Sequence, residues 1–223
     1  AMFATRLAAS SAAVIMLTGA IGGFNSLAIT AGISIAMILL TSLIVVAGIL
    51  VSWSMEKLSK EYFFLLVLLS MGAYGFFISL DLFTLFFFLE IAVIPKFLLI
   101  GIWGSGNKTN SAMKLALMLM AGSALVFVGL MGIYYNTHTF DIMEIAKMQI
   151  PLQVQLFFFP FAFLGFGIFA ALFPFHTWVP DGHASAPTAA SMFLAGISMK
   201  LGGYACLRVA TYLMPDAAHS YSW

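Results

Sequence analysis

Long runs of apolar residues, interrupted by short polar segments, make up most of the chain. Seven of these runs approach the roughly 20 residues that a helix needs to cross the hydrocarbon core of a bilayer. They cover residues 7–24, 27–53, 62–80, 82–103, 111–135, 156–175 and 188–214. Because the runs are continuous and do not alternate with polar residues, they exclude a strand-based membrane barrel. The pattern predicts an all-α polytopic membrane protein with about seven transmembrane helices.

The polar segments between the runs predict how the spans begin and which way they face. Asp81 separates two spans and is typical of a helix N-cap, and the longest loop, residues 136–155, contains the stretch DIMEIAKM, which predicts a short interfacial helix. Basic residues mark cytoplasmic span ends. One set of span ends carries five basic residues, Arg6, Lys57, Lys60, Lys108 and Lys114, whereas the other set carries only two, Lys147 and Arg208. We therefore expect the first set of ends to be cytoplasmic.

Composition agrees with a membrane location and excludes several other classes. Of the residues, 63% are hydrophobic and 8% are charged, whereas a soluble domain carries about 25% charged residues. The 9 basic and 8 acidic residues offer no basic surface for nucleic acid. A single cysteine, Cys206, excludes disulfides within the chain and cysteine metal clusters. The sequence starts at Ala1 and stops at Trp223 directly after a span, so we expect it to be a piece of a longer protein.

Glu90 lies in the core of the fourth span among apolar helical neighbours. An ionisable group inside a membrane is costly and typically functional, and a carboxyl group there can load and release protons. Pro95 removes the helical donor of the Ile91 carbonyl, which predicts a helix break and an ordered water beside Glu90. The alternative is a neutral glutamic acid that bonds to a neighbouring helix and serves packing alone.

Two lysines within the spans are further candidates for proton transfer. Lys96 follows Glu90 by six residues and points about 120° away from it, so the two are not a simple intrahelical pair. The alternative for Lys96 is a side chain that snorkels to the cytoplasmic interface. Lys200 shares a face of the seventh span with Gly196 and Gly203, which leaves space for water or a close helix. We expect Lys200 to be buried and to exchange protons, with a structural ion pair as the alternative.

His176 and His183 flank Trp178 in the segment that joins the sixth and seventh spans. Pro174 and Pro180 each remove a helical hydrogen bond, which predicts a broken helix in this segment. Histidine titrates near neutral pH and suits a proton relay. Two alternatives remain for the pair. One is a metal site, although only one aspartate accompanies the histidines and the spacing is loose, and the other is a plain interfacial anchor.

The segment HTWVPDGHASAPTAASMFLAGISMKLGGYACLR (176–208) resembles the antiporter-like membrane subunits of NADH–quinone oxidoreductase, respiratory complex I. The similarity is greatest to the subunit M branch, which is subunit 4 in mitochondria and D in chloroplasts. The stretches DLFTLFFFLEIAVIPKFLLIGIWGSG (81–106) and SAMK (111–114) also fit the family. The resemblance covers about residues 27–223, roughly the first half of the family's length.

The resemblance implies redox-coupled proton translocation in a bacterial plasma membrane, a thylakoid or a mitochondrial inner membrane. Residues 61–223 would form the first antiporter-like five-helix half-channel and residues 1–60 the preceding N-terminal helices, with the second, inverted repeat absent from this chain. Glu90 matches a family glutamate that tunes a lysine, and Lys200 matches the lysine of the eighth helix. No cofactor is expected on this chain. The flavin, iron–sulfur clusters and quinone would belong to partner subunits.

The expected partners are other membrane-arm subunits of the complex, including sister antiporter-like subunits, together with lipid and without nucleic acid. One departure from the family concerns its central lysine in the broken helix, where this chain has Phe169. Either Glu90, Lys96, His176 and waters carry protons by another route, or the subunit is a degenerate, non-pumping spacer. A subunit of a cation/proton antiporter or of a membrane-bound hydrogenase, and a membrane metalloenzyme, are the further alternatives.

Overall fold

The computed structural model describes residues 32–222, so the first predicted span, residues 7–24, and the start of the second lie outside the described residues. Six helical segments within the described part are long and apolar enough to cross a membrane. Together with the absence of strands among residues 32–222, they confirm an all-α polytopic membrane protein. Bilayers favour this architecture because helices satisfy their backbone polar groups internally.

The spans follow the predicted runs, except that the sixth begins four residues and ends six residues earlier than its predicted run, residues 156–175. They are α2 (Gly32–Val51), α3 (Ser59–Ile78), α4 (Leu82–Trp103), α5 (Lys108–Thr137), α7 (Leu152–Phe169) and a composite span from Thr188 to Thr211. The composite span joins α9 (Thr188–Phe193), the π-helix η2 (Leu194–Ser198), α10 (Met199–Ala205) and the π-helix η3 (Cys206–Thr211). The short elements are α6 (Ile142–Ile145), the 3-10 turn η1 (Phe175–Thr177), α8 (Trp178–Ser185) and α11 (Pro215–Ser220).

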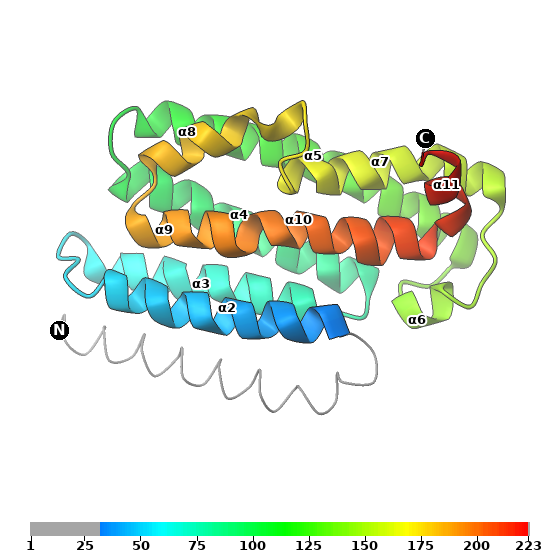
Figure 1. Cartoon of the computed structure of the whole chain (residues 1–223), viewed down its shortest axis with the longest axis horizontal. Helices are drawn as coiled ribbons and strands as arrows, with labels where there is room; N and C mark the ends of the chain where they lie inside the picture. Colours follow the sequence, from blue (N-terminus) through cyan, green and yellow to red (C-terminus); the bar gives the residue numbers. More distant parts are fainter. Residues whose placement is uncertain (1–31, 223) are drawn as a thin grey trace.

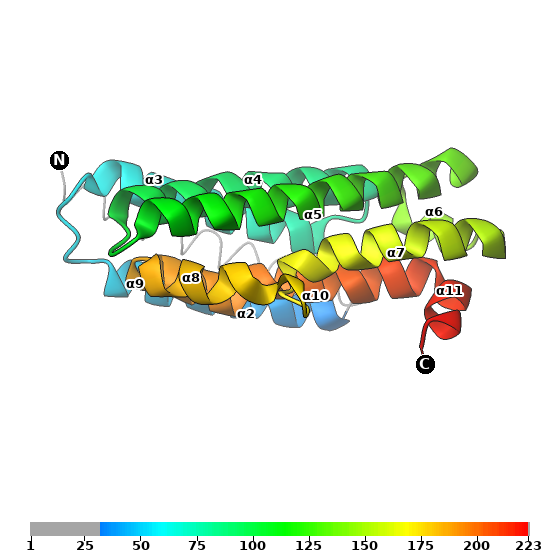
Figure 2. The ribbon, with the colours of Figure 1, turned by 90° about the horizontal axis from the view of Figure 1, so that it is seen from above.

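The helices lie nearly parallel along the long axis of the molecule (Figure 1). Seen from above, they form two layers, one of α3, α4 and α5 and one of α2, α7, α8 and the composite span (Figure 2). Small residues let the helices approach closely. A Cβ added to Gly129 of α5 would lie 2.9 Å from the Ala162 nitrogen of α7, and one added to Gly72 of α3 would lie 3.0 Å from the Ala92 nitrogen of α4.

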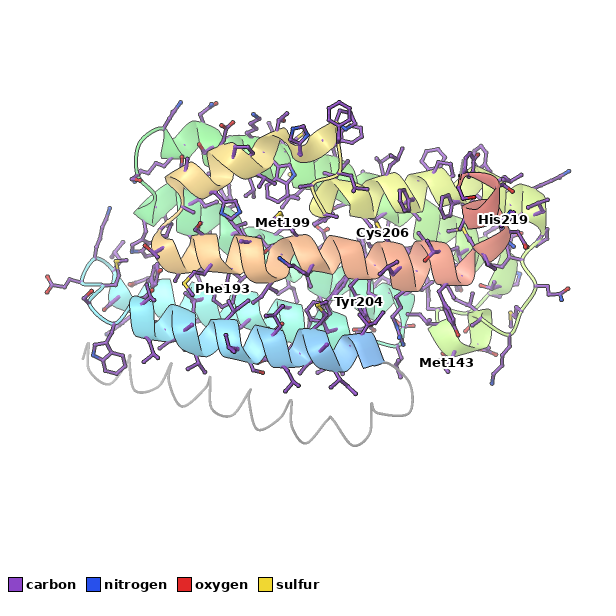
Figure 3. The ribbon with its side chains drawn as sticks, viewed as in Figure 1. Met143, Phe193, Met199, Tyr204, Cys206 and His219 are labelled. Atoms are coloured by element: carbon purple, nitrogen blue, oxygen red, sulfur yellow. The ribbon has the colours of Figure 1, made fainter. Side chains whose placement is uncertain are left out.

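Hydrogen bonds between pairs of hydroxyl groups join α2 to the rest of the bundle. Ser34 bonds to Tyr204 of α10 at 2.6 Å, and Ser42 bonds to Tyr74 of α3 at 2.5 Å. Tyr204 and Phe193 project from the composite span toward α2, whereas Met199 and Cys206 project to its opposite side (Figure 3). Because lipid supplies no hydrogen-bond partners, such buried pairs hold neighbouring helices in register.

The helix predicted to break near Pro174–Pro180 is broken, but earlier than expected, because residues 170–174 already separate α7 from η1 and α8. Helix α7 ends at Phe169, Ala171 has a positive φ of 61°, and the Phe173–Pro174 peptide bond is cis. Trp178 closes the break, because its Nε1 donates to the Ile168 carbonyl at 3.1 Å and its side chain is buried.

The predicted breaks at Pro95 and Pro180 are wrong. Helix α4 continues through Pro95 from Leu82 to Trp103. Proline is tolerated within a transmembrane helix because neighbouring helices and local adjustments satisfy the freed backbone groups. Pro180 falls in the first turn of α8, where a backbone N–H has no intrahelical acceptor and proline therefore costs little.

The predicted N-cap and interfacial helix are both present. Asp81 Oδ2 accepts a hydrogen bond from the Thr84 nitrogen at 2.8 Å at the start of α4. Asp141 caps α6 in the same way, accepting from the Met143 nitrogen at 2.7 Å. An antiparallel bridge between Asp81 and Asp141 joins the two loops.

Candidate functional site

Glu90 of α4 is partly buried and is bound by a serine from the next helix. The Ser123 hydroxyl of α5, which is 7% exposed, donates to Glu90 Oε1. The same hydroxyl lies 3.0 Å from the Leu119 carbonyl, a second acceptor. A hydroxyl carries one proton and two lone pairs. Ser123 can therefore donate to an ionised Glu90, or accept from a protonated Glu90 while donating to Leu119, so the pair accommodates both protonation states.

Lys96 lies further along the same helix and is almost completely enclosed. Its side chain is 2% exposed, and its Nζ has no hydrogen-bond partner among the described residues. The Glu90 carboxylate is close enough to interact with it electrostatically; the two positions are roughly 9 Å apart along the helix axis. Burial contradicts the alternative of a lysine that snorkels to the interface, because Lys96 shares the face of Leu89, Ala92 and Leu99 that packs into the bundle.

Phe169 occupies the place where the resemblance leads us to expect a lysine. It is the last residue of α7 and is 1% exposed. Gly202 of α10 packs directly against this end of α7, since a Cβ added there would lie 2.3 Å from the Ala170 nitrogen and 2.7 Å from the Phe169 carbonyl carbon. The end of α7 is therefore apolar and tightly packed.

The two histidines lie in different surroundings. His183 is half-buried, and its Nδ1 pairs with the Ser191 hydroxyl of α9 at 2.8 Å. His176 is exposed and stacks on the Phe173 ring with centroids 5.6 Å apart. The structure therefore places His183, but not His176, where it contacts the bundle.

Lys200 does not lie inside the described bundle. Its side chain is exposed, and its Nζ donates to the Ala195 carbonyl in the widened turn of η2. The prediction that Lys200 is buried is wrong for this chain, because the span packs through Leu201 and Ala205 on another face. The predicted site residues thus separate into an interior group, Glu90 and Lys96, and outlying groups.

Several polar contacts were not foreseen from the sequence. Ser123 pairs with Glu90, and Lys114 of α5 pairs with Asp181 of α8 at 2.7 Å. A second bond between the same helices joins the Ser111 and Ser185 hydroxyls at 2.7 Å. Serine in a small-residue stretch of a span is a weak signal, and partner choice depends on which helices meet.

Among residues 32–222, no group of three histidine, cysteine or acidic side chains could hold a metal ion. The interior group consists of the Glu90 carboxyl group, bound to the Ser123 hydroxyl, and the Lys96 amine six residues later on the same helix, which has no hydrogen-bond partner within residues 32–222. Both groups can gain and lose a proton.

Known proteins resemble this chain both in sequence and in structure. NAD(P)H-quinone oxidoreductase chain 4-2 of Synechocystis sp. is 35% identical over 192 residues, which is 85% of this chain and 34% of the relative. NADH-quinone oxidoreductase subunit M of Rickettsia bellii is 37% identical over 194 residues, 86% of this chain and 39% of the relative. The chain therefore spans between about a third and two fifths of the length of these curated relatives.

Solved structures agree. A chain of respiratory complex I from Thermus thermophilus matches with a TM-score of 0.76 and 25% identity, over 84% of this chain and 40% of that one. A chain of the Mrp complex from Dietzia sp. matches with a TM-score of 0.77 at 19% identity, over 95% of this chain and 45% of that one, and shows the fold alone. The family described as "NADH:quinone oxidoreductase/Mrp antiporter, TM" matches residues 79–223. The chain is an integral, multi-pass membrane protein and belongs to this family.

Proposed function

We propose that this chain is part of a membrane-arm subunit of a NADH- or ferredoxin–quinone oxidoreductase and takes part in redox-coupled proton translocation. The observation that carries the proposal is the Glu90–Ser123 pair in the bundle interior, with Lys96 enclosed further along the same helix. Ionisable groups at membrane depth that face a bundle interior typically serve ion and proton pathways. The similarity to subunit M and chain 4 proteins supports the redox partner.

In this proposal the described residues hold protons and the electron chemistry occurs elsewhere. Flavin, iron–sulfur clusters and quinone belong to partner subunits, and the partners include sister antiporter-like subunits. Glu90 exchanges protons with waters, and Ser123 keeps its carboxyl group in place in both protonation states. In this proposal His183, with its partner Ser191, relays protons near α8, whereas His176 and Lys200 act at the outer surface of the chain or against a partner.

Redox-driven proton uptake into membrane vesicles of the intact complex tests the proposal. Glu90→Gln keeps the side-chain shape and removes the titrating group, so we expect proton uptake to fall while the complex still assembles. Glu61→Gln is the matched control, because Glu61 is exposed in the first turn of α3. Wild-type uptake in the Glu90 variant would contradict the proposal.

A non-pumping spacer subunit is the second candidate, and Phe169 favours it. An apolar, closely packed residue at the end of α7 cannot carry a proton. A spacer should tolerate Glu90→Gln without any change in the proton-to-electron ratio. The same vesicle experiment therefore separates the two candidates.

A further inference from the structure

Lys96 is a charged group without a partner in an apolar interior. Its side chain is 2% exposed, and no described group forms a hydrogen bond with Nζ. An ammonium group cannot remain unsolvated in such a place, so it either loses its proton or binds water. Either outcome makes Lys96 different from a structural lysine, which would be paired.

Helix α4 itself carries polar groups that could bind a water beside Lys96. Pro95 lacks an N–H and so leaves the Ile91 carbonyl without its α-helical donor, one turn before Lys96. The Glu90 carboxylate acts on the ammonium electrostatically. A buried water needs about two to four polar partners, and the Nζ, the Ile91 carbonyl and the Glu90 carboxylate are such partners along one helix.

Among residues 32–222, the other ionisable groups on the helices that pack against α4 lie near the helix ends or are bonded to other partners. On α3, Lys60 and Glu61 lie in the first turn, and Tyr62 and Tyr74 are bonded to Ser52 and Ser42 of the α2 side of the bundle. On α5, Lys108 lies in the first turn, Lys114 in the second turn is paired with Asp181 of α8, and Tyr134 and Tyr135 lie at the far end. The α9 segment that contacts α4 contains no ionisable side chain. Glu90 is thus the charged group that acts on Lys96 electrostatically, and water is the other group that can bind its amine.

We propose that Lys96 is the proton-loading group of this half of the subunit, served by bound water, in place of any ionisable group at the apolar end of α7. This inference rests on the proposed function and adds its central residue. On loading, the lone pair of the neutral amine takes a proton from a hydronium ion, which becomes water. On unloading, one N–H bond breaks, its proton passes to a bound water, and the electron pair stays on the nitrogen. The negative charge of the Glu90 carboxylate favours the loaded, protonated form of Lys96. Protonation of Glu90 removes that charge and so drives unloading.

The test uses the intact complex in proteoliposomes, with quinone reduction and proton uptake measured on the same preparation. Lys96→Met removes the proton carrier, and Lys96→Arg keeps a positive charge that cannot be released. We expect both variants to lose proton uptake per electron while uncoupled quinone reduction persists. Lys60→Met is the matched control, because Lys60 is exposed at the start of α3.

The outcomes separate this inference from the proposed function. A wild-type proton-to-electron ratio in Lys96→Arg would make Lys96 a fixed charge, and a wild-type ratio in Lys96→Met would give it no role; either result overturns the inference. If Glu90→Gln lowers the ratio while both Lys96 variants do not, the inference alone fails. If Glu90→Gln also leaves the ratio unchanged, the proposed function fails with it.

A second measurement tests the bound water without relying on pumping. In a Cys206→Ala background, Lys96→Cys should react with a small, water-soluble thiosulfonate reagent, whereas Leu99→Cys, on the same buried face, should not. Equal protection of both cysteines would mean that the site is dry and would overturn the inference.

Discussion

Adjacent glycines in α10 offer a direct test of how the broken helix is held. Gly202 packs against the end of α7, where an added Cβ would lie 2.3 Å from the Ala170 nitrogen and 2.5 Å from the Phe166 carbonyl oxygen. A Cβ added to Gly203 would meet no atom within 4 Å. We expect Gly202→Ala to destabilise the packing of α10 on α7 and Gly203→Ala to be tolerated.

Helix propensity contributes equally to both variants, so the expected difference in stability comes from packing alone. Glycine-to-alanine replacement within a helix gains about 1 kcal/mol in helix propensity at either position. Overpacking a well-filled site costs about 1–3 kcal/mol, and at Gly202 the opposing atoms are backbone, which cannot rotate away. The net difference between the two variants is therefore about 1–3 kcal/mol, which corresponds to roughly a 5- to 150-fold change in the ratio of folded to unfolded protein, since 1.4 kcal/mol is tenfold.

Denaturant titration of the purified membrane complex in mixed micelles measures this difference, with retention of the subunit as the readout. The midpoint for Gly202→Ala should fall below that of Gly203→Ala, and Gly203→Ala should match or exceed wild type. Equal midpoints for the two variants would show that α10 does not pack on the end of α7 as described.

Two further variants probe the segment after the break. Trp178→Phe removes the bond from Nε1 to the Ile168 carbonyl, which also accepts from the Ala171 nitrogen, and it shortens a fully buried side chain. The expected cost is about 0.5–1.5 kcal/mol for the bond and about 1–3 kcal/mol more for the lost ring atoms, so wild-type stability on denaturant titration would contradict this account. Lys114→Met breaks the ion pair with Asp181, whose side chains are 37% and 47% exposed; such a pair contributes about 0–1 kcal/mol, so stability at high salt should equal that of wild type.

The spans could be predicted because hydrocarbon imposes a simple length and composition on them. The fourth span, for example, has the bounds predicted from its apolar run, Leu82–Trp103. The break before α8 was also predictable from Pro174. The effects of Pro95 and Pro180 were not, because they depend on where a proline falls within its helix and on which helices surround it.

The candidate site was only partly predictable. Glu90 and Lys96 stand out as ionisable residues in an apolar run, but whether Lys96 is enclosed or reaches the interface depends on which face of α4 packs into the bundle. For the same reason the sequence could not show that Lys200 is exposed, because this depends on which face of the composite span packs into the bundle. Ser123 could not be paired with Glu90 from the sequence, because the approach of α5 to α4 is a long-range packing result.

The central claim is that Glu90 takes part in coupled proton transfer. The most direct measurement is the proton-to-electron ratio of the intact complex in sealed vesicles, with wild type, Glu90→Gln and Glu61→Gln compared at equal rates of quinone reduction. The account predicts a lowered ratio in Glu90→Gln alone. A wild-type ratio in Glu90→Gln, with the variant fully assembled, would contradict it.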